Sequence, residues 1–318
     1  MISKKPINIA ASIQAKLLTL AKKRGEDYNY LLTRYVGERL LYRLSQSPYQ
    51  KQYILKGATL FKVWNGEPHR ATKDLDLLCF GNNEIEYLVN VYQEVCAIHC
   101  EEDGIIFLPE SVKGELIKED QEYEGVRIKL KGKLVKIEIT IQVDIGFGDA
   151  VTPDAEEVEI EPILDAPKAR LRIYPRETVV AEKFQAMVSL GIRNSRIKDF
   201  YDIWFLCQNF KFKGDLLRQA FINTFQRRKT EIPVKEPLAL TEEFANDSDK
   251  QKQWQAFKNK LKIVDTPNSF GELINEIKDF IMPPCLAAAE NETFDKLWNT
   301  SGKWEDVNNL FILSNIRP

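Results

Sequence analysis

The sequence lacks any long apolar run. None of its hydrophobic segments approaches the roughly 18–20 residues that a membrane-spanning helix needs, and the opening MISKKPINIAASIQ has no apolar core of a secretory signal peptide. Its five cysteines are odd in number and form no Cys-x-x-Cys pair, which argues against a disulfide framework. Cys96, His99 and Cys100 leave a metal site open, although their apolar neighbours favour a plain helix end. We therefore expect a cytoplasmic protein with reduced thiols and no membrane partner.

Charge is balanced overall but uneven along the chain. The 318 residues carry a net charge of −2 and suggest two domains, at roughly 150 residues per domain. Residues 166–230 contain 14 Lys or Arg and five acids, a net charge of +9, so the remainder carries −11. Such a region is a candidate surface for nucleic acid, and solvated helix faces would give the same count. No exposed heptad pattern is present, which favours a monomer.

Hydrophobic periodicity divides the chain into a mixed α/β part and a mainly helical part. In the clearest strand, 134–147, valines and isoleucines alternate with polar residues, and the polar face ends in Asp144. We expect an α+β fold with domains at 1–166 and 167–318. The first two helices form a packed lead-in without chemistry of their own. The expected elements are helices at 9–24, 28–44 and 82–99, strands at 104–108, 124–130 and 134–147 with a turn at 131–133, and helices from 176 onward. Pro283-Pro284 should end the helix that begins at Phe270. In the tail, we expect four apolar residues to pack on the helical part: Trp298, Trp304, Leu310 and Phe311.

Two carboxylates stand close together at the start of a predicted buried strand. Asp74 and Asp76 are two residues apart and share one face of that strand, while Leu75 points to the core. Such a pair repels unless a proton or a cation lies between its members. Hard oxygen ligands near a glycine turn, here at Gly57, suit Mg²⁺ and phosphate, and Asp144 would complete the ligand set of a two-metal phosphoryl-transfer site. Solvated acids at strand ends would give the same pattern.

A second group of charged residues lies in the helical part. Asp199 and Asp202 are three residues apart and share one helix face, which Lys183 on the preceding helix can approach. A lysine held there by carboxylates would neutralise charge on a leaving pyrophosphate. An ordinary ion pair of Asp199 with Lys183 or Arg196 would explain the same spacing.

Four motifs follow one another along the chain: LKGATLFKVW with RATKDLDL, QVDIGFGD, YPRETVVAEKFQA and NSRIKDFYDIW. Together they resemble the AbiEii/AbiGii family of nucleotidyltransferase toxins. The resemblance extends to the tail and covers nearly the whole chain. It implies a nucleotidyltransferase fold of the DNA-polymerase-β type, with a mixed sheet and flanking helices, joined to a helical C-terminal domain. It also implies a toxin of a toxin–antitoxin or abortive-infection system with a cognate antitoxin, and transfer of nucleotides to tRNA ends is known in relatives.

The resemblance also assigns residues. Asp74, Asp76 and Asp144 match the metal ligands, and with Lys183 and Asp199 they form the expected catalytic set. The family's turn usually reads Gly-Gly or Gly-Ser, whereas here Ala58 offers no hydroxyl to a phosphate. The expected nucleotide-binding residues are Lys56, Gly57, Ala58, Thr59, Arg70, Thr72 and Asp202.

We therefore expect a Mg²⁺-dependent nucleotidyltransferase that binds a nucleoside triphosphate between the two domains. It would transfer a nucleotide to an acceptor hydroxyl, on tRNA, and act as a toxin. Two other interpretations stay open: a module that binds a nucleotide or a partner protein without turnover, and nucleotidylation of a protein side chain.

Overall fold

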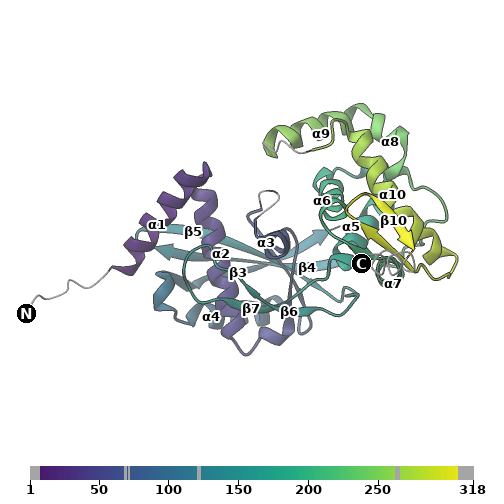
Figure 1. The fold of residues 1–318 in the computed structure, drawn as a ribbon. Coiled ribbons are helices and arrows are strands. Elements are labelled where there is room, and N and C mark those ends of the chain that lie inside the picture. Colours follow the sequence, from purple (N-terminus) through teal and green to yellow (C-terminus); the bar gives the residue numbers. More distant parts are fainter. Residues whose placement is uncertain (1–7, 68–69, 71, 120–122, 262–265, 307–318) are drawn as a thin grey trace, which may run out of the picture. The chain divides into compact units, whose positions relative to one another are not determined.

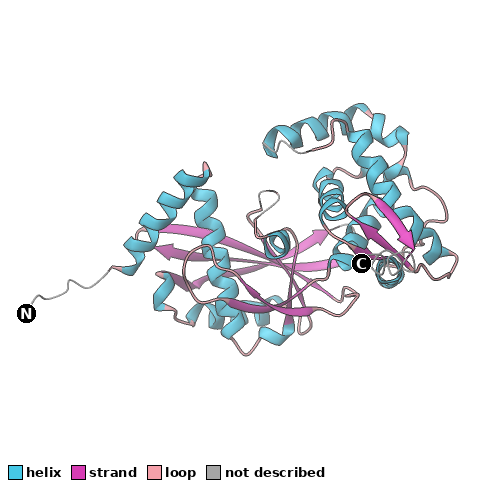
Figure 2. Cartoon of the chain, in the orientation of Figure 1, coloured by secondary structure: helices cyan, strands magenta, loops and turns pink. Residues whose placement is uncertain are grey.

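The computed structural model describes residues 8–67, 70, 72–119, 123–261 and 266–306. Its contacts divide the chain into two compact units, one made of Met1–Gly148 with Glu156–Tyr174 and the other of Asp149–Ala155 with Pro175–Pro318. One large sheet with helices forms the first unit, and helices dominate the second (Figures 1 and 2). The predicted α+β fold, with a mixed sheet followed by a mainly helical part, is confirmed.

The first unit is organised on a seven-stranded mixed sheet with the order β3-β4-β5-β2-β1-β7-β6. The pairs β2/β5 and β1/β7 are parallel, and the other neighbours are antiparallel. Because β7 pairs with β1, the first unit continues eight residues past the predicted domain limit of 166. The strands are β1 (Tyr53–Lys56), β2 (Leu75–Cys79), β3 (Ile105–Glu119), β4 (Tyr123–Leu134), β5 (Ile137–Phe147), β6 (Glu156–Ile160) and β7 (Ala169–Ile173).

Helices of the first unit are α1 (Ile9–Arg24), α2 (Tyr28–Gln46), α3 (Thr59–Asn65) and α4 (Ile85–Ala97). Helix α2 begins where the Asp27 carboxylate accepts the backbone N–H of Tyr30 at 2.8 Å. It crosses one face of the sheet (Figure 1) and packs against β5 and β7. Leu75 of β2 points to this helix, since a Cβ built on Gly37 would lie 3.6 Å from the Leu75 side chain. The residue after Leu75 therefore points to the opposite face.

The hairpin of β4 and β5 is confirmed, but its predicted turn is wrong. The chain turns at Val135-Lys136, with Val135 at φ +55°, and β4 continues through Lys131–Lys133. Gly132 lies inside the strand because α2 packs on it: a Cβ there would lie 2.6 Å from the Val36 side chain. The predicted short strand at 104–108 is likewise only the beginning of β3, which is 15 residues long.

The second unit contains α5 (Arg176–Leu190), α6 (Ile197–Asn209), α7 (Gly214–Arg227), α8 (Glu242–Asn246), α9 (Ser248–Leu261) and α10 (Phe270–Ala289). It also holds a small sheet that we did not predict, β10-β9-β8, whose strands span only two to four residues: β8 (Phe212–Lys213), β9 (Lys296–Asn299) and β10 (Lys303–Asp306). Among the described residues, no helix is long and apolar enough to span a membrane.

Pro283-Pro284 does not end helix α10, as we had predicted, but lies inside it. Proline has no N–H, so Pro284 leaves the carbonyl of Phe280, four residues earlier, without its helical partner. The indole N–H of Trp304 donates to that carbonyl at 3.1 Å, and the Trp304 ring stacks on the Phe280 ring at 5.8 Å. Trp298 also packs on Phe280, at 5.0 Å. Packing of these two tryptophans on the helices is thus confirmed, whereas Leu310 and Phe311 lie outside the described residues.

Candidate active site

Four charged side chains form a row across adjacent strands of the first unit. Lys56 of β1 is the register partner of Asp76 in β2, Asp76 is the partner of Asp144 in β5, and Asp144 is the partner of Arg127 in β4. Register partners share one face of a sheet. Since Asp76 points away from α2, all four side chains lie on the face opposite that helix. We call Lys56, Asp76, Asp144 and Arg127 the charged row.

Gly57 holds the place beside Asp76 where the chain leaves β1. Its backbone is left-handed at φ +76°, and a Cβ there would lie 1.9 Å from Oδ2 of Asp76. Only glycine satisfies both conditions. The Asp76 carboxylate therefore lies directly against the backbone turn. The next residue, Ala58, is 5% exposed and offers no capping hydrogen bond at the start of α3.

The Asp144 carboxylate is held in one orientation by two neighbours. The Arg127 guanidinium donates to both carboxylate oxygens at 2.8 Å, and the Gln142 amide donates at 3.1 and 3.2 Å. A two-pronged, charge-assisted pair of this kind fixes geometry as well as charge. The hydrogen bonds to Asp144 raise the pKa of Arg127 above its usual range. We did not predict Arg127, because only the strand register shows that it faces Asp144.

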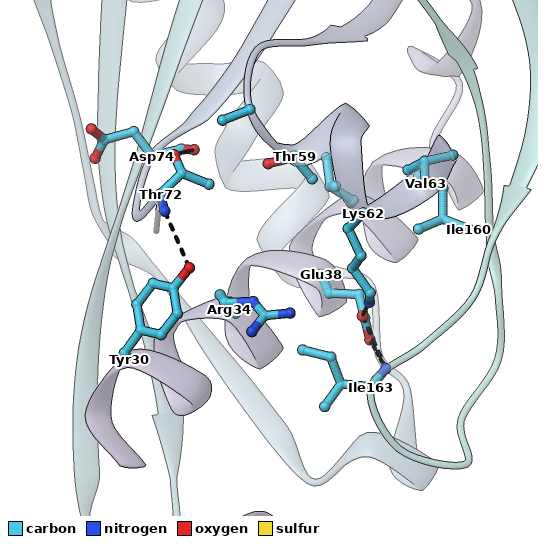
Figure 3. Close-up of a pocket in the computed structure, with 12 residues that line it drawn as sticks. Tyr30, Arg34, Glu38, Thr59, Lys62, Val63, Thr72, Asp74, Ile160 and Ile163 are labelled. Carbon is cyan, nitrogen blue, oxygen red and sulfur yellow. Dashed lines mark hydrogen bonds and ion pairs between the residues drawn. The ribbon is translucent and has the colours of Figure 1, made fainter. Parts of the chain in front are cut away.

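The residues that lead into β2 lie beside a pocket. Asp74 is exposed and comes one residue before the strand, and the Thr72 backbone N–H donates to the Tyr30 hydroxyl of α2 at 3.2 Å. Asp74, Thr72, Thr59 and Ala58 all line this pocket. In Figure 3 the Asp74 carboxylate points away from the pocket, while Thr59 stands at its upper rim. Arg70, the remaining predicted residue of this segment, is partly exposed.

The second unit brings together Lys183, Asp199 and Asp202. The Lys183 ammonium lies 2.5 Å from Oδ1 of Asp199 and 2.9 Å from Oδ2 of Asp202. The side chain of Asp202 is completely buried and that of Lys183 is 15% exposed. One buried lysine thus faces two carboxylates from helix α6. The same contact would also serve a purely structural ion pair between α5 and α6.

The acids of the first unit suit a metal ion whose coordination is completed by the substrate. Among the described residues, no group of three or more His, Cys, Asp or Glu side chains is arranged to hold a metal, so neither the three predicted aspartates nor Cys96 with His99 and Cys100 form a ready-made cage. Mg²⁺ in nucleotide sites is typically bound by one or two carboxylates together with substrate phosphates. Asp76 and Asp144, as partners on neighbouring strands, match that donor set.

A comparison with protein families assigns most of the chain to one family. A model described as "Nucleotidyl transferase AbiEii toxin, Type IV TA system" matches residues 39–276, a stretch that contains the charged row and the Lys183 group. The match makes the chain a nucleotidyltransferase-type protein. It belongs to the AbiEii family of toxins of type IV toxin–antitoxin systems.

Two crystal structures from Helicobacter pylori are similar to the chain. One, described as a nucleotidyltransferase, is 19% identical with a TM-score of 0.45, and the match covers 83% of this chain and 98% of the other. The second, JHP933, is 17% identical with a TM-score of 0.42 and coverages of 81% and 94%. No curated protein sequence matches the chain.

Proposed function

We propose that this chain is a Mg²⁺-dependent nucleotidyltransferase that transfers a nucleotide from a nucleoside triphosphate to an acceptor hydroxyl on tRNA, and that a cognate antitoxin restrains it. The observation that carries the proposal is the charged row, in which Asp76 and Asp144 are register partners flanked by Lys56 and Arg127. Membership of a family of nucleotidyltransferase toxins supports the same activity.

Each member of the row has a proposed task. Asp76 and Asp144 hold Mg²⁺, which when bound neutralises phosphate charge and lowers the pKa of the acceptor hydroxyl. Lys56 attracts the triphosphate, because it is the cation on the Asp76 side of the row. Arg127 orients the Asp144 carboxylate through its two hydrogen bonds. Gly57 leaves room for the Asp76 carboxylate beside the turn, and backbone amides of such a turn would bind the phosphates.

By resemblance to the family, Lys183 would belong to the catalytic set as the cation that stabilises charge on a departing pyrophosphate, with Asp199 and Asp202 holding its ammonium in place. Exposed cations in the basic region would contact the phosphate backbone of tRNA, and such contacts make binding depend on salt. These exposed cations include Lys198, Lys211, Lys213 and Arg227.

The test is transfer of label from α-phosphate-labelled nucleotides in the presence of Mg²⁺ and total tRNA. We expect label on RNA with wild-type protein and none with Asp76→Ala. Equal transfer by Asp76→Ala would refute the site. Mg²⁺-dependent nucleotide binding without transfer would identify a binding module instead. Label that survives ribonuclease but not protease would identify a protein acceptor.

A further inference from the structure

Helix α3 follows directly on the glycine turn of the candidate site. The carbonyl of Gly57 accepts the backbone N–H of Leu60 at 3.2 Å, and the carbonyl of Ala58 accepts that of Phe61 at 3.3 Å. The turn that lies against Asp76 is thus joined to the first turn of the helix. Any shift of α3 therefore moves the backbone amides of the proposed phosphate site.

Little within α3 itself fixes its position. The helix spans only Thr59–Asn65, and Ala58 at its start supplies no side-chain hydrogen bond as a cap. Helices shorter than about 12–15 residues are marginally stable on their own. The buried side chains of α3 are those of Leu60 and Phe61. The position of the helix therefore depends on contacts with other elements.

A carboxylate of helix α2 supplies such a contact. The Lys62 ammonium donates to Oε2 of Glu38 at 2.8 Å and to the backbone carbonyl of Glu161 at 3.0 Å. The backbone N–H of Ile163 lies 3.1 and 3.0 Å from the two carboxylate oxygens of Glu38. In Figure 3 the Glu38 carboxylate lies between the Lys62 side chain and Ile163. Glu38 thus joins α3 to α2 and to the connection between β6 and β7.

The Glu38 carboxylate is itself held in place. Its side chain is 7% exposed, and the Arg39 guanidinium donates to its Oε1 at 3.0 Å. Arg39 is fully buried and also donates to the carbonyl of Pro167 at 2.7 Å. Charge-assisted hydrogen bonds are short and strong, and the low dielectric of a buried site strengthens them further. Glu38 is therefore a fixed anchor for Lys62, unlike the partner in a mobile surface pair.

We propose that Glu38 is a positioning residue of the active site, which holds the glycine turn in place through Lys62 and α3. This inference rests on the proposed function, because the turn is where the phosphates would bind. Glu38 acts on the phosphates through the position of α3 and not by contact with them. Helix α2, which we predicted to have no chemistry of its own, thus sets the geometry of the phosphate site.

The clearest test removes the anchor from the α3 side. Lys62→Met leaves the other contacts of Glu38 intact. Calorimetry measures the affinity for the common ribonucleoside triphosphates with Mg²⁺, and hydrogen exchange measures local opening of α3. The dissociation constant of the tightest-binding triphosphate, and its KM for transfer, should rise about tenfold with kcat little changed, as expected when a residue that supports a binding site is removed. Amides of α3 should exchange faster than in the wild type, whereas those of α4 should not.

A second variant removes the same contact from the α2 side. Glu38→Gln keeps the shape of the side chain and should give the same changes. Combining it with Lys62→Met should add little to the larger single effect, because both substitutions break one contact. Glu26→Gln is the control: it removes a partly buried carboxylate that pairs with Arg34 of α2, and it should leave triphosphate affinity and the exchange of α3 unchanged.

Wild-type triphosphate affinity and KM in Lys62→Met would overturn the inference, and so would unchanged exchange of the α3 amides. Faster exchange throughout the first unit without loss of triphosphate affinity would likewise reduce the contact to a structural one. The binding measurement stands whether or not transfer occurs. Triphosphate binding that depends on Lys62, without any transfer by the wild-type protein, would therefore refute the proposed function alone.

Discussion

Replacing Gly57 by alanine tests whether the glycine turn and Asp76 form one unit. The substitution has two separable costs. A left-handed alanine costs roughly 1–2 kcal/mol. The new Cβ would also lie 1.9 Å from Asp76 Oδ2 and 2.6 Å from its Cγ, which forces the carboxylate to move, and overpacking of this kind typically costs about 1–3 kcal/mol. We expect Gly57→Ala to lower the free energy of unfolding by about 2–5 kcal/mol.

Gly66 at the other end of α3 is the matched control. Its φ is +80°, yet a Cβ there would meet nothing within 4 Å. Gly66→Ala should therefore lose only the roughly 1–2 kcal/mol of the backbone term. Urea denaturation of the two variants isolates the clash with Asp76 as the difference between them.

Activity should separate the two variants further. Displacing a reacting group by about 1 Å can cost on the order of a hundredfold in rate, so nucleotidyl transfer by folded Gly57→Ala should fall by about that factor while Gly66→Ala stays close to wild type. Equal stability losses and equal rates in the two variants would refute the contact between Gly57 and Asp76.

Three further changes test other parts of the structure. Arg127→Met should lower the transfer rate because the Asp144 carboxylate is no longer held in one orientation. The free energy of unfolding in urea should fall by under about 1 kcal/mol, because the Arg127–Asp144 pair is partly exposed. Lys129→Met, which breaks a half-exposed ion pair on the same strand, should change neither the transfer rate nor the free energy of unfolding. Lys183→Met should lower the free energy of unfolding by about 3–5 kcal/mol, because two buried carboxylates lose their cation. Adding Asp202→Asn should restore part of the lost stability without restoring transfer. An unchanged free energy of unfolding in Lys183→Met would contradict the buried ion pair. Burial raises the pKa of the Cys285 thiol to about 12 from 9.0, so the contribution of the protonated thiol to the free energy of unfolding is present below pH 9 and is lost as pH rises toward 12. Between pH 9 and 11, the free energy of unfolding of Cys285→Ala should therefore fall less steeply than that of the wild type, by about 1.4 kcal/mol per pH unit. The same pH dependence in both proteins would refute the raised pKa.

The alternation of residues along β5 was enough to predict which face Asp144 occupies, because side-chain direction in a strand is a local property. The charged row was not predictable as a whole. It depends on which residues of four strands are partners, and strand register is set by pairing between distant segments. Arg127 therefore appeared in the sequence as an ordinary cation within a strand, whereas Lys56 was assigned to nucleotide binding through the family resemblance.

Other differences also arise from contacts that are distant in sequence. Lys131-Gly132-Lys133 has the composition of a turn, yet Gly132 serves the packing of Val36 on β4. Pro283-Pro284 has the composition of a helix end, yet Trp304 supplies the missing hydrogen bond.

The transfer rate of Asp144→Asn, compared with that of Glu138→Gln, tests most directly whether the charged row is the active site. Both acids lie on β5 with their side chains on the same face, and both pair with a cation. With folding of each variant verified by urea denaturation, we predict that Asp144→Asn lowers transfer by about a hundredfold or more, whereas Glu138→Gln leaves it unchanged. Equal rates for the two variants would contradict the assignment of the charged row.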